Sequence, residues 1–217
     1  ITPQSLLMAS EQKYKEGDGA YLRWEANNRS ELLVFSDKGQ CYKTSLDQFD
    51  DTKASVLGDY LPTKLGMDPG EGVAWACITD DYSGHLLFFF ENGKCARVEL
   101  TAYQTQTRRK KLSGAYSEKS PLVDCVHLKE DMEMAAISTE GRCVVFHTAS
   151  LSPKTTRNTQ GVAVMTLKPK HKLEKAVPLS ATAIQDPARY RKTIPAMGAL
   201  LKPEDRGEKQ MTLFPEA

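Results

Sequence analysis

The chain has 217 residues, which is enough for one large β-domain or two small ones. Its 29 Lys and Arg residues nearly balance 28 Asp and Glu residues, so the net charge excludes any simple argument for nucleic-acid binding. The longest apolar run, residues 85–90, is too short to span a membrane and predicts a buried strand, so we expect no membrane partner.

The cysteines and the start of the sequence indicate the cellular compartment and the origin of the chain. An odd number of cysteines without a Cys-x-x-Cys pair argues against a disulfide framework or a zinc site. We expect no cofactor in this segment. Reduced cysteines in apolar stretches are typical of a cytoplasmic protein. The sequence starts at Ile1 and has no signal peptide, so we interpret it as a fragment in which residues 1–16 lead in from an upstream domain.

Three segments repeat one pattern: a short apolar run, a polar turn that ends in Gly, and a Cys two residues later. Each pattern predicts a β-hairpin, because Gly adopts the positive φ of a tight turn without a steric penalty. Asn92-Gly93 is the strongest of the three turn signals. The hairpins are expected at residues 32–43, 86–97 and 134–145.

Four strand-like segments accompany the hairpins and are expected to lead into successive units. They lie at residues 17–24, 70–77, 122–128 and 161–167. Units of this size with several strands each predict an all-β, propeller-like domain of three to four blades over residues 17–179, either closed or an open arc. The Pro-rich residues 180–217 are expected to form a C-terminal tail, extended or helical in patches.

The order of hairpin, basic loop and Gly-led strand resembles the blades of the C-terminal domain of the A subunit of bacterial DNA gyrase and topoisomerase IV. The closest stretch runs from Arg157 through Gly161 to Lys168. The resemblance implies a β-pinwheel that bends double-stranded DNA around a basic rim. It also implies an ATP-dependent type II topoisomerase as the parent enzyme, with the rest of the A subunit and the ATPase B subunit as partners. No catalytic residue is expected in this fragment.

One departure from the gyrase pattern bears on the activity. Gyrases carry a Gln-Arg-Arg-Gly-Gly-x-Gly box, whereas residues 106–114 supply the cations without the paired glycines. The resemblance therefore favours a topoisomerase IV-like enzyme.

DNA binding of this kind needs Lys and Arg side chains that neutralise phosphates. The densest cluster lies in the loop of the second unit, and the alternative interpretation is a solvated charged loop. The candidate DNA-binding residues are Arg108, Arg109, Lys110, Lys111, Lys154, Arg157, Lys168, Lys170 and Lys172.

The C-terminal segment carries a second candidate site. Gln210, Leu213 and Phe214 form a Gln-x-x-Leu-Phe pattern similar to peptides that dock on the bacterial sliding clamp. The alternative is that Leu213 and Phe214 pack back on the domain. For the whole chain, the competing hypothesis is a protein-interaction β-propeller without nucleic-acid binding, which the near-neutral charge would suit.

Overall fold

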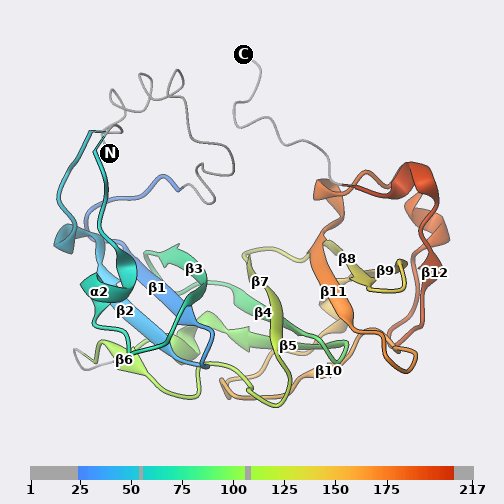
Figure 1. The fold of residues 1–217 in the computed structure, drawn as a ribbon, viewed down its shortest axis with the longest axis horizontal. Helices are drawn as coiled ribbons and strands as arrows, with labels where there is room; N and C mark the ends of the chain where they lie inside the picture. The colour runs from blue at the N-terminus through green and yellow to red at the C-terminus, as the bar shows by residue number, and fades with distance from the viewer. Residues whose placement is uncertain (1–23, 54–55, 106–108, 208–217) are drawn as a thin grey trace. The chain divides into compact units, whose positions relative to one another are not determined.

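The computed structural model describes residues 24–53, 56–105 and 109–207. The chain divides into two compact units, and each consists of the residues that pack together rather than of one continuous segment. Unit 1 comprises residues 1–81 and 107–113, and unit 2 comprises residues 82–106 and 114–217. The described residues form three four-stranded antiparallel sheets, so the prediction of an all-β chain is confirmed (Figure 1).

Unit 1 contains one sheet, in the order β3-β1-β2-β6, and a short helix that covers part of it. Leu32, Val34, Tyr42 and Ala76 are buried in its core, and apolar residues of the helix pack against them. The elements are β1 (Glu31–Ser36), β2 (Cys41–Ser45), η1 (Leu46–Gln48), α2 (Leu61–Leu65), β3 (Val73–Thr79) and β6 (Lys111–Leu112).

Unit 2 contains the other two sheets, in the orders β10-β5-β4-β7 and β11-β8-β9-β12. Their shared core includes Phe89 and Phe146, whose ring centroids lie 6.4 Å apart. The first sheet has β4 (His85–Phe90), β5 (Lys94–Glu99), β7 (Leu122–Leu128) and β10 (Val162–Ala163). The second has β8 (Glu133–Ser138), β9 (Arg142–His147), β11 (Leu173–Pro178) and β12 (Ala199–Leu200).

The remaining elements of unit 2 are short 3-10 helices. They are η2 (Leu100–Tyr103), η3 (Thr148–Ser150), η4 (Leu179–Ala181), η5 (Pro187–Arg189) and η6 (Pro203–Asp205). Among the described residues, no helix is both long and apolar enough to cross a membrane.

The three predicted hairpins are present as β1–β2, β4–β5 and β8–β9. Their turn glycines, Gly39, Gly93 and Gly141, have φ values of 66°, 78° and 77°. Each hairpin pairs the Cys after its turn with an apolar residue of the first strand, and these cysteines are buried. In each hairpin, the Gly marks the turn, and the Cys two residues later marks the first buried position of the second strand.

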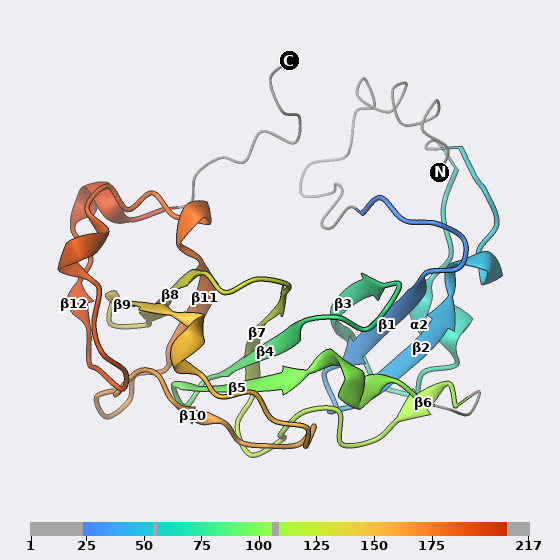
Figure 2. The same cartoon turned by 180° about the vertical axis from the view of Figure 1, so that it is seen from behind.

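The fourth strand of each sheet reaches its hairpin from later in the chain. β6, which follows the hairpin β4–β5, pairs with β2, and β10, which follows β8–β9, pairs with β5 (Figures 1 and 2). β12 pairs with β9 in the same way. We call β6, β10 and β12 the returning strands.

The prediction of an equivalent lead-in strand at residues 161–167 is wrong. Only Val162–Ala163 form a strand there, and they pair with β5 as a returning strand. The position held by β3 and β7 in the other sheets is taken by β11, which pairs with β8. A register shift between Leu173 and Lys175 interrupts the alternation of β11, which hid this strand from the sequence pattern.

The third sheet continues beyond residue 180, where the sequence analysis placed the start of a tail. β12 completes this sheet, and Tyr190 is fully buried beside Leu201. The hydroxyl of Tyr190 donates a hydrogen bond of 2.5 Å to Asp205 Oδ2, and the backbone N–H of Gln185 donates to Oδ1 of the same carboxylate. Buried polar groups with partners of this kind tie the segment to the sheet.

Candidate nucleic-acid interface

The returning strands of unit 2 begin at glycines that no other residue could replace without strain. Gly161 has a φ of 72°, and a Cβ built on it would lie 2.1 Å from the carbonyl oxygen of Cys95. Gly198 has a φ of 77°, and its Cβ would lie 2.4 Å from the carbonyl oxygen of Cys143. The glycine at the end of the Arg157–Gly161 loop therefore lets the returning strand approach β5 closely.

The returning strand of unit 1 carries cations instead. Arg109 and Lys110 precede and adjoin β6, and both are exposed. Neither makes an ion pair with another residue in the part of the chain that the structure describes. Arg108 lies outside the described residues. These two neighbouring side chains are therefore available to neutralise phosphates.

Lys111 has a different environment from its two neighbours. Its Nζ lies 2.5 Å from Asp68 Oδ2 and 5.6 Å from the centroid of the Tyr42 ring. The hydrogen bond from Lys111 is the main cause that lowers the pKa of Asp68, and the same bond raises the pKa of Lys111. The charge of Lys111 is thus matched within unit 1.

In unit 2, two predicted residues of the loop before β10 have distinct roles. Lys154 is exposed, and its backbone forms a parallel bridge with Val98. Arg157 is partly buried, and its Nη1 donates a 3.0 Å hydrogen bond to the carbonyl oxygen of Ala102, while its Nε is buried. Arg157 therefore holds the loop, and Lys154 is the exposed cation.

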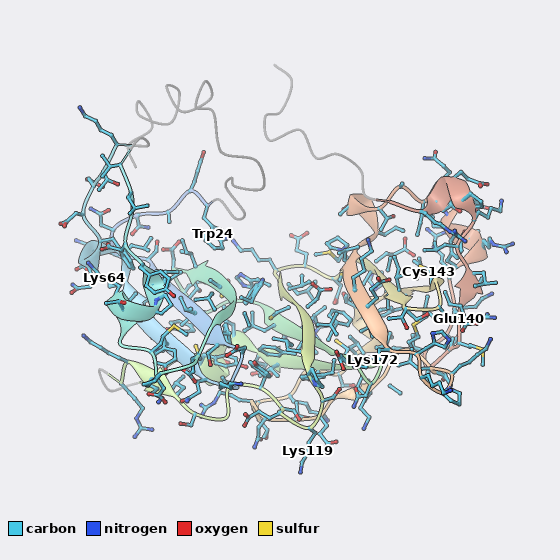
Figure 3. The ribbon with its side chains drawn as sticks, in the orientation of Figure 1. Trp24, Lys64, Lys119, Glu140, Cys143 and Lys172 are labelled. Atoms are coloured by element: carbon cyan, nitrogen blue, oxygen red, sulfur yellow. The ribbon has the colours of Figure 1, made fainter. Side chains whose placement is uncertain are left out.

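Two of the three lysines between β10 and β11 form ion pairs with acids; Figure 3 labels Lys172 and Glu140, which belong to different pairs. Lys168 Nζ lies 2.5 Å from Glu140 Oε1, and Lys172 Nζ lies 2.7 Å from Glu91 Oε2. Lys170 is exposed at a φ of 69° and makes no ion pair with a described residue. Exposed pairs of this kind contribute little stability, but they reduce the positive potential of the loop.

Sequence reasoning missed Arg191 of unit 2, and it treated Arg97 only as a weaker candidate for DNA contact. Arg191 stands seven residues before Gly198, as Lys154 stands seven before Gly161, and it makes a bidentate pair with Glu133. Only the spacing to the glycine could have indicated it. Arg97 is buried, which no local pattern reveals.

Arg97 is buried and lies at the centre of a partly buried polar cluster. Its Nη1 donates to Asp131 Oδ1 at 2.8 Å and to the carbonyl oxygen of Thr148 at 2.9 Å, and its Nη2 lies 3.2 Å from His85 Nδ1. The Thr148 hydroxyl also donates to Asp131, which is the main cause of the lowered pKa of that carboxyl group. The cluster joins β5 to the turn after β9 and is structural.

Two remaining questions concern the C-terminal motif and possible metal ligands. Gln210, Leu213 and Phe214 lie outside the described residues. Among the residues described, no group of three or more His, Cys, Asp or Glu side chains is arranged to hold a metal ion.

Comparisons with known proteins agree with this fold. A family model described as "DNA gyrase C-terminal domain, beta-propeller" matches residues 30–55 and 133–180. The A subunit of DNA topoisomerase 4 of Bacillus subtilis strain 168 is 29% identical over 100 residues, which cover 45% of this chain and 12% of that protein. The corresponding protein of Staphylococcus aureus is 22% identical over 141 residues, which cover 64% of this chain and 18% of its own length.

Solved structures give the same result. The crystal structure of the C-terminal domain of DNA topoisomerase IV superposes with a TM-score of 0.76 at 21% identity, covering 92% of this chain and 67% of that one. The Escherichia coli ParC C-terminal domain superposes with a TM-score of 0.67 at 17% identity, covering 90% and 86%.

The fold is therefore that of the β-propeller-like C-terminal domains of type IIA topoisomerase A subunits. The resemblance to the C-terminal domain of the gyrase and topoisomerase IV A subunits, predicted from the sequence, is confirmed. The chain spans less than a fifth of the length of these curated relatives.

Proposed function

We propose that this chain is the DNA-binding and DNA-bending domain of the A subunit of an ATP-dependent type II topoisomerase, more similar to topoisomerase IV than to gyrase. Its partners would be double-stranded DNA, the rest of the A subunit and the ATPase B subunit, in the cytoplasm. The observation that carries the proposal is the pair of exposed cations, Arg109 and Lys110, that directly precede the returning strand β6 and form no ion pair with a described residue.

The preference for a topoisomerase IV-like role rests on the segment around β6. Lys110 and Lys111 stand where the gyrase box has paired glycines, and the curated relatives described above are named as topoisomerase 4 subunits. Bending a duplex costs on the order of several kcal/mol, so Lys154 and Lys170 would have to contribute phosphate contacts as well.

The test is a fluorescence-anisotropy titration of a labelled duplex of about 40 base pairs at several salt concentrations. Binding should weaken linearly on a log–log plot, because each neutralised phosphate releases counterions. End-labelled duplexes should also show increased energy transfer when bound, because bending brings the ends together. Binding that is absent, or insensitive to salt, would refute the proposal and favour the protein-interaction propeller.

A separate proposal concerns the C-terminal motif Gln210, Leu213 and Phe214. We propose that it docks on the sliding clamp, with Gln210 forming hydrogen bonds and the two apolar side chains filling pockets. A labelled peptide of residues 205–217 should bind purified clamp, and replacement of Leu213 and Phe214 by Ala should abolish binding. A peptide that shows no saturable binding at concentrations of about tens of micromolar would refute the proposal.

A further inference from the structure

The returning strand of unit 1 is weakly held by its backbone. β6 has two residues, which pair with Cys41 and Tyr42, and the N–H of Lys43 donates a 2.8 Å hydrogen bond to the carbonyl oxygen of Lys110. A strand this short gains little from its ladder, so side-chain contacts contribute much of what fixes it.

Lys111 occupies the position that glycine holds in the other two returning strands. Leu112 lies opposite Cys41 in the same register as the residues after Gly161 and Gly198 lie opposite their cysteines. Lys111 has no positive φ, so this strand does not make the close approach that requires glycine. Unit 1 therefore has a long side chain where unit 2 has none.

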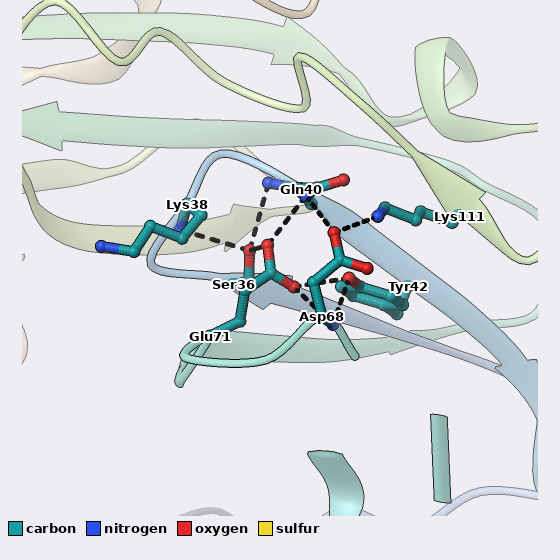
Figure 4. A network of polar contacts seen from close by, with 7 residues as sticks. All are labelled: Ser36, Lys38, Gln40, Tyr42, Asp68, Glu71 and Lys111. Atoms are coloured by element: carbon teal, nitrogen blue, oxygen red, sulfur yellow. Dashed lines mark hydrogen bonds and ion pairs between the residues drawn. The ribbon is translucent and has the colours of Figure 1, made fainter. Parts of the chain in front are cut away.

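That side chain ends in a polar network built on the hairpin of unit 1 (Figure 4). Asp68 accepts from both Lys111 Nζ and Gln40 Nε2, and its own backbone N–H donates to the Tyr42 hydroxyl at 3.1 Å. The Tyr42 hydroxyl and Gln40 Nε2 in turn donate to Glu71, at 2.5 and 2.9 Å. Through Tyr42, the network links the far end of Lys111 to β2, the strand that pairs with β6.

We propose that Lys111 and Asp68 are positioning residues that hold β6 on its sheet, so that Arg109 and Lys110 face the phosphate backbone. This inference rests on the proposed DNA-binding function. It assigns different roles to neighbouring cations: Arg109 and Lys110 contact DNA, whereas Lys111 is already neutralised by Asp68 and orients the strand that carries them.

The deciding variant is Asp68→Asn, because a phosphate-contact role and a positioning role of Lys111 predict opposite changes in DNA affinity. If Lys111 were a phosphate contact, removing its acid would free it and strengthen DNA binding. If the pair positions β6, the variant should bind the duplex about threefold more weakly, although it has lost a negative charge. Asp50→Asn is the matched control, since Asp50 is exposed and has no hydrogen bond to β6; it should bind as tightly as the wild type or slightly more tightly.

A second set of variants separates positioning from general stability. In an Arg109→Ala, Lys110→Ala background, Asp68→Asn should no longer weaken DNA binding, because there are no cations left to orient. Lys111→Arg should retain most of the wild-type affinity, because arginine keeps the pair with Asp68 and the contact with the aromatic ring. Equal loss of affinity in both backgrounds would overturn the positioning role.

Hydrogen exchange of the Lys43 amide, measured without DNA on the 217-residue chain, reports directly on the attachment of β6. Its protection should fall about threefold in Asp68→Asn and in Lys111→Met. Unchanged protection in both variants would refute the role of the pair even if DNA binding is confirmed. A wild-type chain that does not bind DNA would refute the DNA-binding function instead, and the exchange data would still show whether the pair holds the strand.

Discussion

Replacement of Gly161 by Ala should destabilise unit 2 far more than the same change at Gly141. Both glycines have a φ above 70°, so each alanine incurs a backbone penalty of about 1–2 kcal/mol. At Gly141 nothing lies within 4 Å of the new Cβ. At Gly161 the Cβ would lie 2.1 Å from a backbone oxygen of β5, so β10 must move away by about 1 Å and lose its pairing. We expect a total cost of about 3 kcal/mol for Gly161→Ala and about 1 kcal/mol for Gly141→Ala.

Urea unfolding followed by far-UV circular dichroism measures the difference. Fluorescence of tryptophan would not report on unit 2, because Trp24 and Trp75 both belong to unit 1. Equal shifts in the unfolding free energy for the two variants would show that the close approach of β10 to β5 carries no energetic weight. The returning strand would then not be a structural requirement of the sheet.

Three further predictions follow from buried groups of unit 2. Burial raises the pKa of Cys143 to about 12, so intact-mass analysis after iodoacetamide treatment near pH 8 should show this thiol unmodified in the native protein and modified in urea. Arg97→Met should lower the unfolding free energy by about 2–4 kcal/mol in urea titrations, because Asp131 and the carbonyl groups of Thr148 and Leu151 lose their donor. The hydrogen bond from Tyr190 lowers the pKa of Asp205 below its unfolded value. The contribution of the Asp205 carboxylate to folding stability is therefore present above about pH 4 and is lost as the pH falls through the lower, folded-state pKa. The difference in unfolding free energy between wild type and Asp205→Asn should disappear in acid.

The hairpins were predictable because their signal is local. Turn glycines require positive φ, and the Cys two residues later marks an inward-facing position, so both features lie within one short segment. The returning strands were not predictable, because β6 and β10 are two residues long and their partners lie more than 60 residues away in the sequence. β11 was missed because its register shift and charged residues interrupt the alternation.

The sequence predicted which basic residues belong to the candidate site, but not which of them are unpaired and which form ion pairs or structural hydrogen bonds. Lys110 and Lys168 are equivalent in the sequence, as basic residues in polar loops. The structure leaves Lys110 unpaired among the described residues and pairs Lys168 with Glu140. Arg157 likewise reads as a phosphate contact, yet its guanidinium group donates to a carbonyl oxygen. Such distinctions depend on tertiary neighbours, which composition and spacing do not report.

The central claim is that Arg109 and Lys110, which directly precede β6, contribute to DNA binding, whereas the paired lysines of unit 2 do not. The salt dependence of two double variants tests it. Arg109→Ala, Lys110→Ala should reduce the slope of log affinity against log salt by about 2, because two phosphate contacts are lost. Lys168→Ala, Lys172→Ala removes the same charge from residues already neutralised by Glu140 and Glu91, and should leave the slope nearly unchanged. Equal reductions in the two variants, or a larger one in the second, would contradict the account.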